Sequence, residues 1–285
     1  MKNIINYLTA FVFAIALISC NSTANPTSGN PADQYQCPMK CEGEKTYAQA
    51  ERCPVCGMNL VKVEVKNNSK ASASNVKIVG AMMNIMHKGE LFGTIDLDTI
   101  SNRQHLYGLA PLEYLKGEIL IVDGKSYVSR VASDGSIAME ETYKVKAPFF
   151  VSENVSDWKE VSLPDSVQTI PQLESFLVET TKHHSRPFAF RLTATIESCE
   201  IHIVNLPTGT EVHSPEDAHK NQKSYHFTNE NSELVGFFST EHQGVFTHHD
   251  TFVHIHLITS DKKKMGHADT LSMKKGTAKL YLPTE

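Results

Sequence analysis

One strand-like run near the C-terminal end constrains the fold of this chain more than any other segment. It reads Phe252-Val-His254-Ile-His256-Leu-Ile. Because successive side chains of a β-strand point to opposite faces, His254 and His256 project to the same side. The polar residues 260–266 predict a turn, after which His267 opens a returning strand. The pattern therefore predicts a hairpin that brings three imidazoles together.

Three imidazoles at one place are the ligand set of a catalytic zinc ion, which binds neutral nitrogen atoms and keeps a fourth position open. We therefore predict a Zn²⁺ site at His254, His256 and His267. The chain contains 14 histidines, so the alternative is that these three are ordinary half-buried residues that pair across strands.

The length and charge of the chain restrict its class. With 285 residues it can form one large core or two medium domains with small attachments. The net charge is −5 and the lysines are scattered, which argues against nucleic-acid binding. The lysine triplet at 262–264 is interpreted as a solvated turn.

The N-terminal segment is predicted to be a signal peptide. Met1-Lys2 precedes an apolar run that ends near Ile18 and is too short to span a bilayer. Leu17-Ile-Ser-Cys20 resembles the bacterial lipoprotein signal, which implies that residues 1–20 are a signal and that Cys20 carries lipid. Residues 21–34 are then a polar tether. We expect an exported protein, anchored to a bacterial membrane in the cell envelope and exposed outside the cytoplasm; the alternative is a plain secretory signal.

Four cysteines form a cluster after the tether. Cys37 and Cys41 are followed by Cys53 and Cys56, a pair of tight turns that is typical of a closed tetrahedral thiolate site for Zn²⁺ or Cu⁺. A segment this small cannot fold on its apolar surface alone, so metal or disulfides must hold it together. Two disulfides are the alternative in an exported protein.

Residues 35–64 also resemble a known module. The runs Tyr35-x-Cys37-Pro-Met39 and Cys53-Pro-x-Cys56-Gly-Met58-x-Leu60 are similar to the small heavy-metal-binding domain of copper and heavy-metal transport proteins. Cys41 stands where the commoner form has His-Pro. Met39 and Met58 are candidate thioether ligands, or else pack a miniature core. Residues 65–75 are interpreted as a linker.

Residues 76–285 are rich in short β-patterned runs. Residues 118–131 predict a hairpin that turns at Asp123-Gly124, and residues 188–196, 200–205 and 278–282 predict strands. A helix is predicted from Pro171, with Leu173 and Leu177 on one face. The methionines of residues 79–86 are interpreted as strand or core positions. The fold class is therefore α+β: mostly β, with mixed or antiparallel sheets and few helices, preceded by the small four-cysteine module.

Several motifs of this domain occur in the order of one family. They are Leu91-Phe-Gly-Thr94, Tyr107-Gly-Leu109, Leu115-Lys-Gly-Glu118, Ala147-Pro-Phe-Phe150, Pro187-Phe-Ala-Phe-Arg191, Val235-Gly-Phe-Phe238 and the histidine hairpin. Over residues 80–283 the chain resembles the acetolactate decarboxylases.

The resemblance implies a role for each site residue. A zinc ion on His254, His256 and His267 would be chelated by the hydroxyl and ketone oxygens of the substrate and stabilise developing charge. Glu118 would handle the proton that ends on carbon. Arg191 would hold the departing carboxylate or the enediolate. Without the resemblance, Glu118 is a solvent-facing hairpin residue and Arg191 a strand-edge ion pair.

Two departures from the family bear on activity. Pro111 stands where the family usually has a threonine that reaches into the site, and proline has no hydroxyl. The sequence ends soon after its last strand, without the tail that returns a glutamate to the site; Glu285 is the candidate substitute. An insertion at residues 246–250 brings His248 and His249 near the metal hairpin, to line the pocket or to face water.

The sequence thus supports two functions of different classes. The first is zinc-dependent decarboxylation of 2-acetolactate, or of a related 2-hydroxy-3-oxo acid, to acetoin and carbon dioxide by an anchored lipoprotein. The second is a non-enzymatic envelope lipoprotein that captures or delivers zinc or copper on a degenerate decarboxylase fold. A related lyase or isomerase for another metal-chelating substrate is a third. The sequence is also compatible with a homodimer.

Overall fold

The computed structural model describes residues 34–37, 42, 45–55, 57–63 and 74–284. The expected signal peptide, Cys20 with its expected lipid, and Met39, Cys41 and Cys56 of the cysteine module lie outside these residues. No helix within the described ranges is both long enough and apolar enough to cross a membrane.

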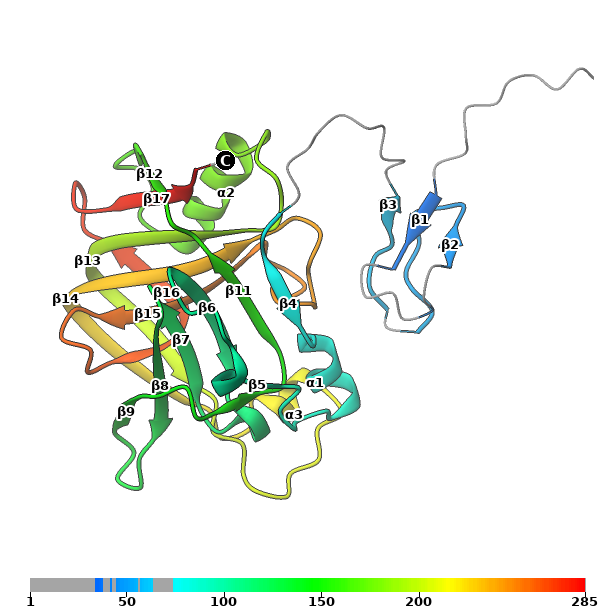
Figure 1. The fold of residues 1–285 in the computed structure, drawn as a ribbon, viewed down its shortest axis with the longest axis horizontal. Coiled ribbons are helices and arrows are strands. Elements are labelled where there is room, and N and C mark those ends of the chain that lie inside the picture. Colours follow the sequence, from blue (N-terminus) through cyan, green and yellow to red (C-terminus); the bar gives the residue numbers. More distant parts are fainter. Residues whose placement is uncertain (1–33, 38–41, 43–44, 56, 64–73, 285) are drawn as a thin grey trace, which may run out of the picture.

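The cysteine module contains a small antiparallel sheet in the order β2-β1-β3 (Figure 1). Its strands are β1 (Gln34–Gln36), β2 (Thr46–Tyr47) and β3 (Val61–Val63). Cys37, Cys53 and Leu60 are buried in one cluster. The Gly57 N–H donates to the Cys53 carbonyl at 2.8 Å, and Gly57 has φ +73°, which suits glycine. This tight turn after Cys53 is the one that the sequence predicts.

The main domain contains two six-stranded antiparallel sheets. The first has the order β4-β11-β6-β7-β8-β9. Its strands are β4 (Lys77–Val79), β6 (Leu106–Pro111), β7 (Glu118–Val122), β8 (Lys125–Val131), β9 (Ile137–Glu141) and β11 (Phe150–Asn154). A separate ladder joins β5 (Ile95–Asp96) to β10 (Lys146–Ala147).

The second sheet has the order β12-β17-β13-β14-β15-β16. Its strands are β12 (Trp158–Val161), β13 (Phe188–Ile203), β14 (Lys223–Phe238), β15 (Val253–Thr259), β16 (Met265–Met273) and β17 (Lys279–Pro283). β13 is one long strand where the sequence predicts two. Because β13 pairs with β14 and also with β16, strands β13 to β16 close on one another. The predicted mostly β fold is confirmed.

In the described part of the chain, three α-helices accompany the sheets: α1 (Met82–Lys88), α2 (Ile170–Thr180) and α3 (Pro215–Ala218). Two single-turn 3₁₀-helices span Leu97–Thr99 and Glu113–Leu115. The predicted helix at Pro171 is α2, and its capping box joins Thr169 to Gln172. For the methionine-rich run 79–86, the prediction of a strand is wrong beyond residue 79. Gly80 has φ +67°, which ends β4, and α1 begins two residues later with Met82 buried.

The two hairpin turns follow from their residues. Asp123 and Gly124 both have positive φ, at 45° and 79°, as the two-residue turn between β7 and β8 requires. The turn between β15 and β16 is shorter than predicted, because the Thr259 N–H already donates to the Lys264 carbonyl at 3.0 Å. β16 therefore begins at Met265, two residues before His267.

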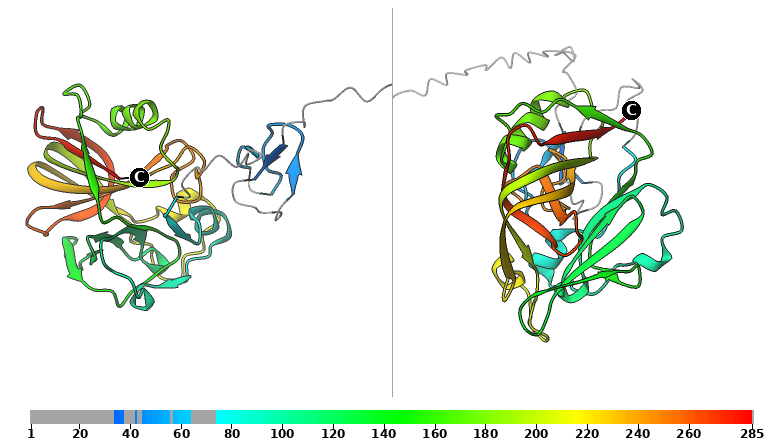
Figure 2. Two further views of the ribbon diagram at one scale, coloured as in Figure 1. Left: turned by 45° about the horizontal axis from the view of Figure 1, so that its top comes forward. Right: turned by 90° about the vertical axis from the view of Figure 1, so that its left-hand side faces the viewer.

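The main core lies between the two sheets, which form separate layers (Figure 2). Tyr107, Leu120, Val235 and Phe237 belong to one buried cluster that joins residues of both sheets. Directly paired residues of antiparallel strands share a face, and His254 is paired with Phe237. The histidines of β15 therefore face the first sheet rather than solvent.

Glu153 gives this interlayer core a measurable dependence on pH. It is 6 % exposed on β11 and accepts the Ala189 N–H at 2.8 Å, and burial raises its pKa from 4.5 to about 6. Between these two values the folded state keeps a proton that the unfolded state releases. Glu153 should therefore make the free energy of unfolding fall by about 2 kcal/mol as pH rises from 4.5 through 6. Urea unfolding at pH 4.5 and pH 7 should show that Glu153→Gln lacks this fall; an identical pH dependence in both proteins would refute the assignment.

Candidate metal centre

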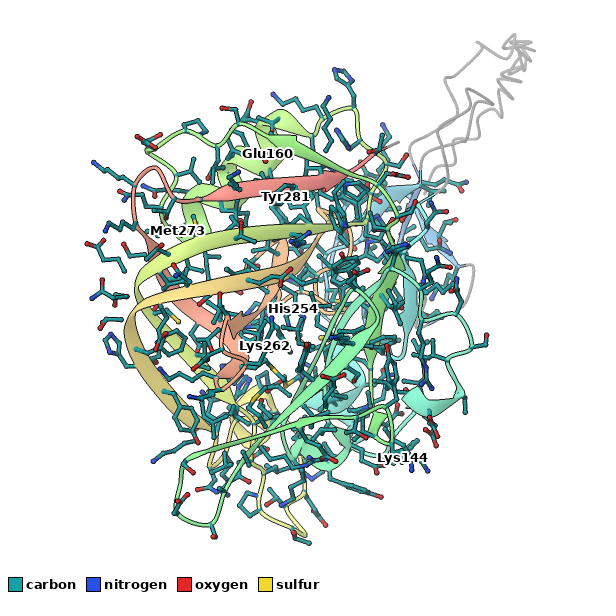
Figure 3. All side chains as sticks on the ribbon, turned by 60° about the vertical axis from the view of Figure 1, so that its left-hand side comes forward. Lys144, Glu160, His254, Lys262, Met273 and Tyr281 are labelled. Carbon is teal, nitrogen blue, oxygen red and sulfur yellow. The ribbon has the colours of Figure 1, made fainter. Side chains whose placement is uncertain are left out.

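The three predicted histidines come together between the sheets. His254 and His256 lie on β15, and His256 is paired with His267 on β16. One nitrogen from each ring lies within 4.8 Å of the other two, and the Nε2 atoms of His254 and His256 are 3.2 Å apart. His256 is fully buried and the other two are nearly so. Figure 3 shows His254 in the interior, among ribbons of both sheets.

The outer nitrogens of two of these rings are held by backbone carbonyls. His254 Nδ1 lies 2.5 Å from the Phe246 oxygen, and His256 Nδ1 lies 2.9 Å from the Ile119 oxygen. A carbonyl can only accept, so each Nδ1 donates and each Nε2 presents its lone pair to the centre. Carbonyl partners of this kind orient imidazoles in metal sites.

The three rings are also neutral, as metal ligands must be. Burial lowers the pKa of His256 to about 3 and the pKa values of His254 and His267 well below the usual 6.5. Nitrogen donors of this number, spacing and charge fit a zinc ion. When bound, zinc would supply Lewis acidity toward substrate oxygens.

Glu118 lies beside the triad, as the resemblance predicts. It begins β7 and is 3 % exposed, so the alternative of a solvent-facing residue is wrong. Its Oε1 accepts the Val204 N–H at 3.1 Å, and its Oε2 lies 3.7 Å from His256 Nε2. Burial raises the pKa of Glu118 to about 7. A carboxyl group with this pKa can both give and take a proton near neutral pH.

A cavity opens beside the triad and Glu118. Its wall combines His254, His267 and Glu118 with apolar side chains from α1 and from the first sheet. The lining residues are Met82, Ile85, Met86, Pro111, Leu115, Glu118, Phe149, His202, Val204, Ala218, His219, His248, His254 and His267. The lining contains no arginine or lysine. A substrate carboxylate in this cavity would therefore meet no permanently charged side chain of opposite sign.

Arg191 requires a correction. Arg191 on β13 is paired with Val235 on β14, which is paired in turn with His256 on β15, so all three share one face. Two inter-strand spacings separate the backbones of Arg191 and His256 by about 10 Å. Its Nε donates to Glu233 Oε1 at 2.6 Å, and its guanidinium lies 5.2 Å from the ring centre of Tyr281 on β17. The structure does not bring Arg191 to the cavity, so the prediction that it holds the substrate is not supported. Its ion pair with Glu233 is the alternative that the sequence left open.

The departures from the family pattern are visible in the wall. Pro111 ends β6, is paired with Glu118 and lines the cavity with no hydroxyl to offer. His248 lines the cavity, whereas His249 is exposed and does not. The end of the chain runs along the second sheet, where the Thr284 N–H donates to the Asp157 carbonyl at 3.0 Å. Between Ala268 and Thr284 no residue lines the cavity, and Glu285 lies outside the described residues.

Two histidines of the wall were missed by the sequence reasoning. His202 lies on β13 directly opposite His267, and its Nδ1 is 2.7 Å from Asp269 Oδ1. Burial disfavours its charged form, but the Asp269 hydrogen bond and the Glu118 charge outweigh burial and raise the pKa of His202. Because His202 lies within a run that predicts a strand, its alternation with the neighbouring apolar residues could have marked it as a residue of the sheet. His219 follows the four-residue helix α3, and no sequence pattern marks it.

The family comparisons agree with this architecture. The family model for alpha-acetolactate decarboxylase matches residues 79–283. The chain therefore belongs to the alpha-acetolactate decarboxylase family, and this membership together with the fold supports a decarboxylase, a carbon–carbon lyase. A model described as heavy metal binding domain matches residues 34–63.

Solved structures show the same fold. The alpha-acetolactate decarboxylase of Bacillus subtilis strain 168 is 18 % identical with a TM-score of 0.57, over 74 % of this chain and 86 % of that one. A Staphylococcus aureus protein of unknown function, described as similar to alpha-acetolactate decarboxylase, is 16 % identical with a TM-score of 0.57. The match covers 73 % of this chain and 84 % of that one. No curated protein matches the chain.

Removal of one triad ligand should separate the two expected metal sites. His254→Ala should lose the ion at the triad and leave the cysteine module loaded, because the remaining two imidazoles bind zinc far more weakly than three. Metal analysis of the purified protein checks this, with the exposed His213→Ala as the matched control. A metal content equal to that of the control would refute the triad as a metal site.

Proposed function

We propose that this protein decarboxylates 2-acetolactate, or a related 2-hydroxy-3-oxo acid, to acetoin and carbon dioxide with zinc at His254, His256 and His267. The observation that carries the proposal is the position of Glu118. A buried carboxyl group with a pKa of about 7 lies 3.7 Å from a ring nitrogen of the triad. A site that only stored metal would have no need of a proton-transfer group there.

The chemistry assigns Glu118 a defined task. When the bond between the substrate carbon and its carboxyl group breaks, the electron pair stays on the carbon and carbon dioxide leaves. Protonated Glu118 donates its proton to that carbon, becomes a carboxylate and is protonated again from water. The Val204 N–H, 3.1 Å from Oε1, fixes the carboxyl group in place for the transfer.

The apolar wall supports the same chemistry. Ile85, Leu115 and Phe149 are buried and line the cavity together with the catalytic carboxyl group. They exclude water around the substrate, so the developing charge interacts with the site at low dielectric. The loss of a charged carboxylate as neutral carbon dioxide is favoured in such surroundings.

A second function is favoured by one specific observation. The cavity wall has no arginine or lysine to receive an anionic substrate and instead carries five histidines. Those histidines, with the cysteine module, suit an envelope protein that captures or delivers zinc or copper without catalysis. In that case Glu118 would only balance the charge of bound metal.

Turnover by the zinc-loaded protein separates these functions. The soluble mature protein should form acetoin from racemic 2-acetolactate, and Glu118→Gln should lower kcat by at least about 100-fold, because the amide fills the same space without a transferable proton. Equal zinc content in the two proteins is the necessary control. Tight zinc binding without turnover in the unaltered protein would favour the metal-handling function.

We also propose that the protein is exported and held to a membrane by lipid on Cys20. The basis is the sequence Leu17-Ile-Ser-Cys20 and the polar residues that follow it. Cys20→Ala should move the protein from the membrane fraction to the soluble fraction or leave its signal uncleaved. Mass spectrometry of the N-terminal peptide should find acyl chains on Cys20 of the unaltered protein; an unmodified Cys20 in the membrane fraction would contradict the proposal.

A further inference from the structure

A second cavity opens on the surface, beside the loop that leads into Glu118. Its volume is about 500 Å³, which is the size of a site for a small molecule. Its lining comes from the segments 89–92, 114–116 and 206–210, which lie far apart in the sequence. No residue lines both this cavity and the one beside the triad, so the two are separate sites.

Hydrogen bonds join the three segments and hold the cavity open. The Tyr114 N–H donates to the Leu91 carbonyl at 2.6 Å, and the Leu206 N–H donates to the Leu115 carbonyl at 2.9 Å. The Lys116 ammonium group also donates to the Leu206 carbonyl. The walls are therefore fixed before any ligand arrives, as is usual for small-molecule sites.

The backbone of the middle segment is strained. Tyr114 and Leu115 have φ of 57° and 51°, the left-handed conformation that side chains of this size rarely adopt. The turn buries Leu115 in the wall of the other cavity and leaves Tyr114 54 % exposed. Packing of the core does not require an aromatic ring in solvent at this point. Strained residues of this kind are concentrated at sites that hold ligands.

The cavity also gathers exposed apolar surface. Among the described residues three large hydrophobic side chains are exposed, and two of them, Phe92 and Tyr114, line this cavity. Leu91, Leu206 and Pro207 add further apolar atoms to the lining. Exposed apolar side chains that gather at one place mark a binding surface, whereas single ones need no explanation.

The charge of the lining selects the kind of ligand. Lys116 is its one charged residue, and the lining contains no acidic side chain. The ammonium group has three N–H donors and gives one to the Leu206 carbonyl, so two can reach a ligand. The cavity therefore favours a single negative charge and offers a positive charge no partner.

We propose that this cavity binds a monocarboxylate with an apolar chain or ring. The carboxylate accepts hydrogen bonds from the Lys116 ammonium group, and the apolar part contacts Phe92 and Tyr114. A molecule that also carries an ammonium group is excluded, because no lining carboxylate would receive it. This site is additional to the proposed decarboxylase activity and does not depend on it.

Calorimetric titration of the soluble mature chain with octanoate tests the site. The unaltered protein should bind one octanoate, and Lys116→Met should bind it at least about tenfold more weakly, because the charge is lost while the length is kept. Lys144→Met, exposed and outside the lining, is the matched control and should bind like the unaltered protein. Octylammonium should not bind. Equal affinities in Lys116→Met and the control, or binding of octylammonium, would overturn the proposal.

A carboxylate can also bind a metal ion, so a further variant separates this site from the triad. His254→Ala should bind octanoate as tightly as the unaltered protein. Loss of octanoate binding in His254→Ala would place the ligand at the triad and overturn the proposal. The titration does not use 2-acetolactate, so failure of the decarboxylase proposal through absent turnover would be recognised separately.

Photolabelling of the unaltered protein keeps the test independent of the variants. Octanoate with a diazirine group on its chain should label peptides that contain residues 89–92, 114–116 or 206–210, as identified by mass spectrometry. Labelling confined to other peptides would overturn the proposal. So would binding to phosphatidylglycerol vesicles that Phe92→Ser abolishes, without any binding of octanoate, since that result would assign the surface to a membrane.

Discussion

The pairing of His256 with His267 across β15 and β16 is the constraint on which the site depends. It fixes three imidazoles on one face of the second sheet and turns them toward the first. The period of a strand is two residues, so a slip of one residue in this hairpin would send His254 and His256 to the opposite face. The Thr259–Lys264 hydrogen bond, which closes the turn, therefore sets the site as well as the hairpin.

The site and the main core share one interface. Phe237 is paired with His254, and Val235 with His256, so a strand that carries core residues lies directly beside the strand that carries two of the ligands. Burial has opposite consequences for the two kinds of titratable group. It keeps the histidines neutral and ready to bind metal, and it keeps the Glu118 proton in place up to about pH 7. The same burial therefore sets the protonation state of both the metal ligands and the proton donor.

The sequence predicted what depends on local spacing. The alternation around His254, the Asp123-Gly124 turn and the helix at Pro171 follow from residues within a few positions of one another. The partner of Arg191 could not be named from the sequence because Glu233 lies on β14, 42 positions away, and only the register of β13 on β14 brings the two together. His219 was missed for the same reason: its place in the cavity depends on how a loop folds back over the sheets.

The central claim is that a metal ion is held between the two sheets by His254, His256 and His267. X-ray diffraction from crystals of the zinc-loaded protein, collected on both sides of the zinc absorption edge, tests it most directly. We predict an anomalous peak within bonding distance of a nitrogen of each of the three rings, about 2 Å. A peak confined to the cysteine module, with none at the three histidines, would contradict the account.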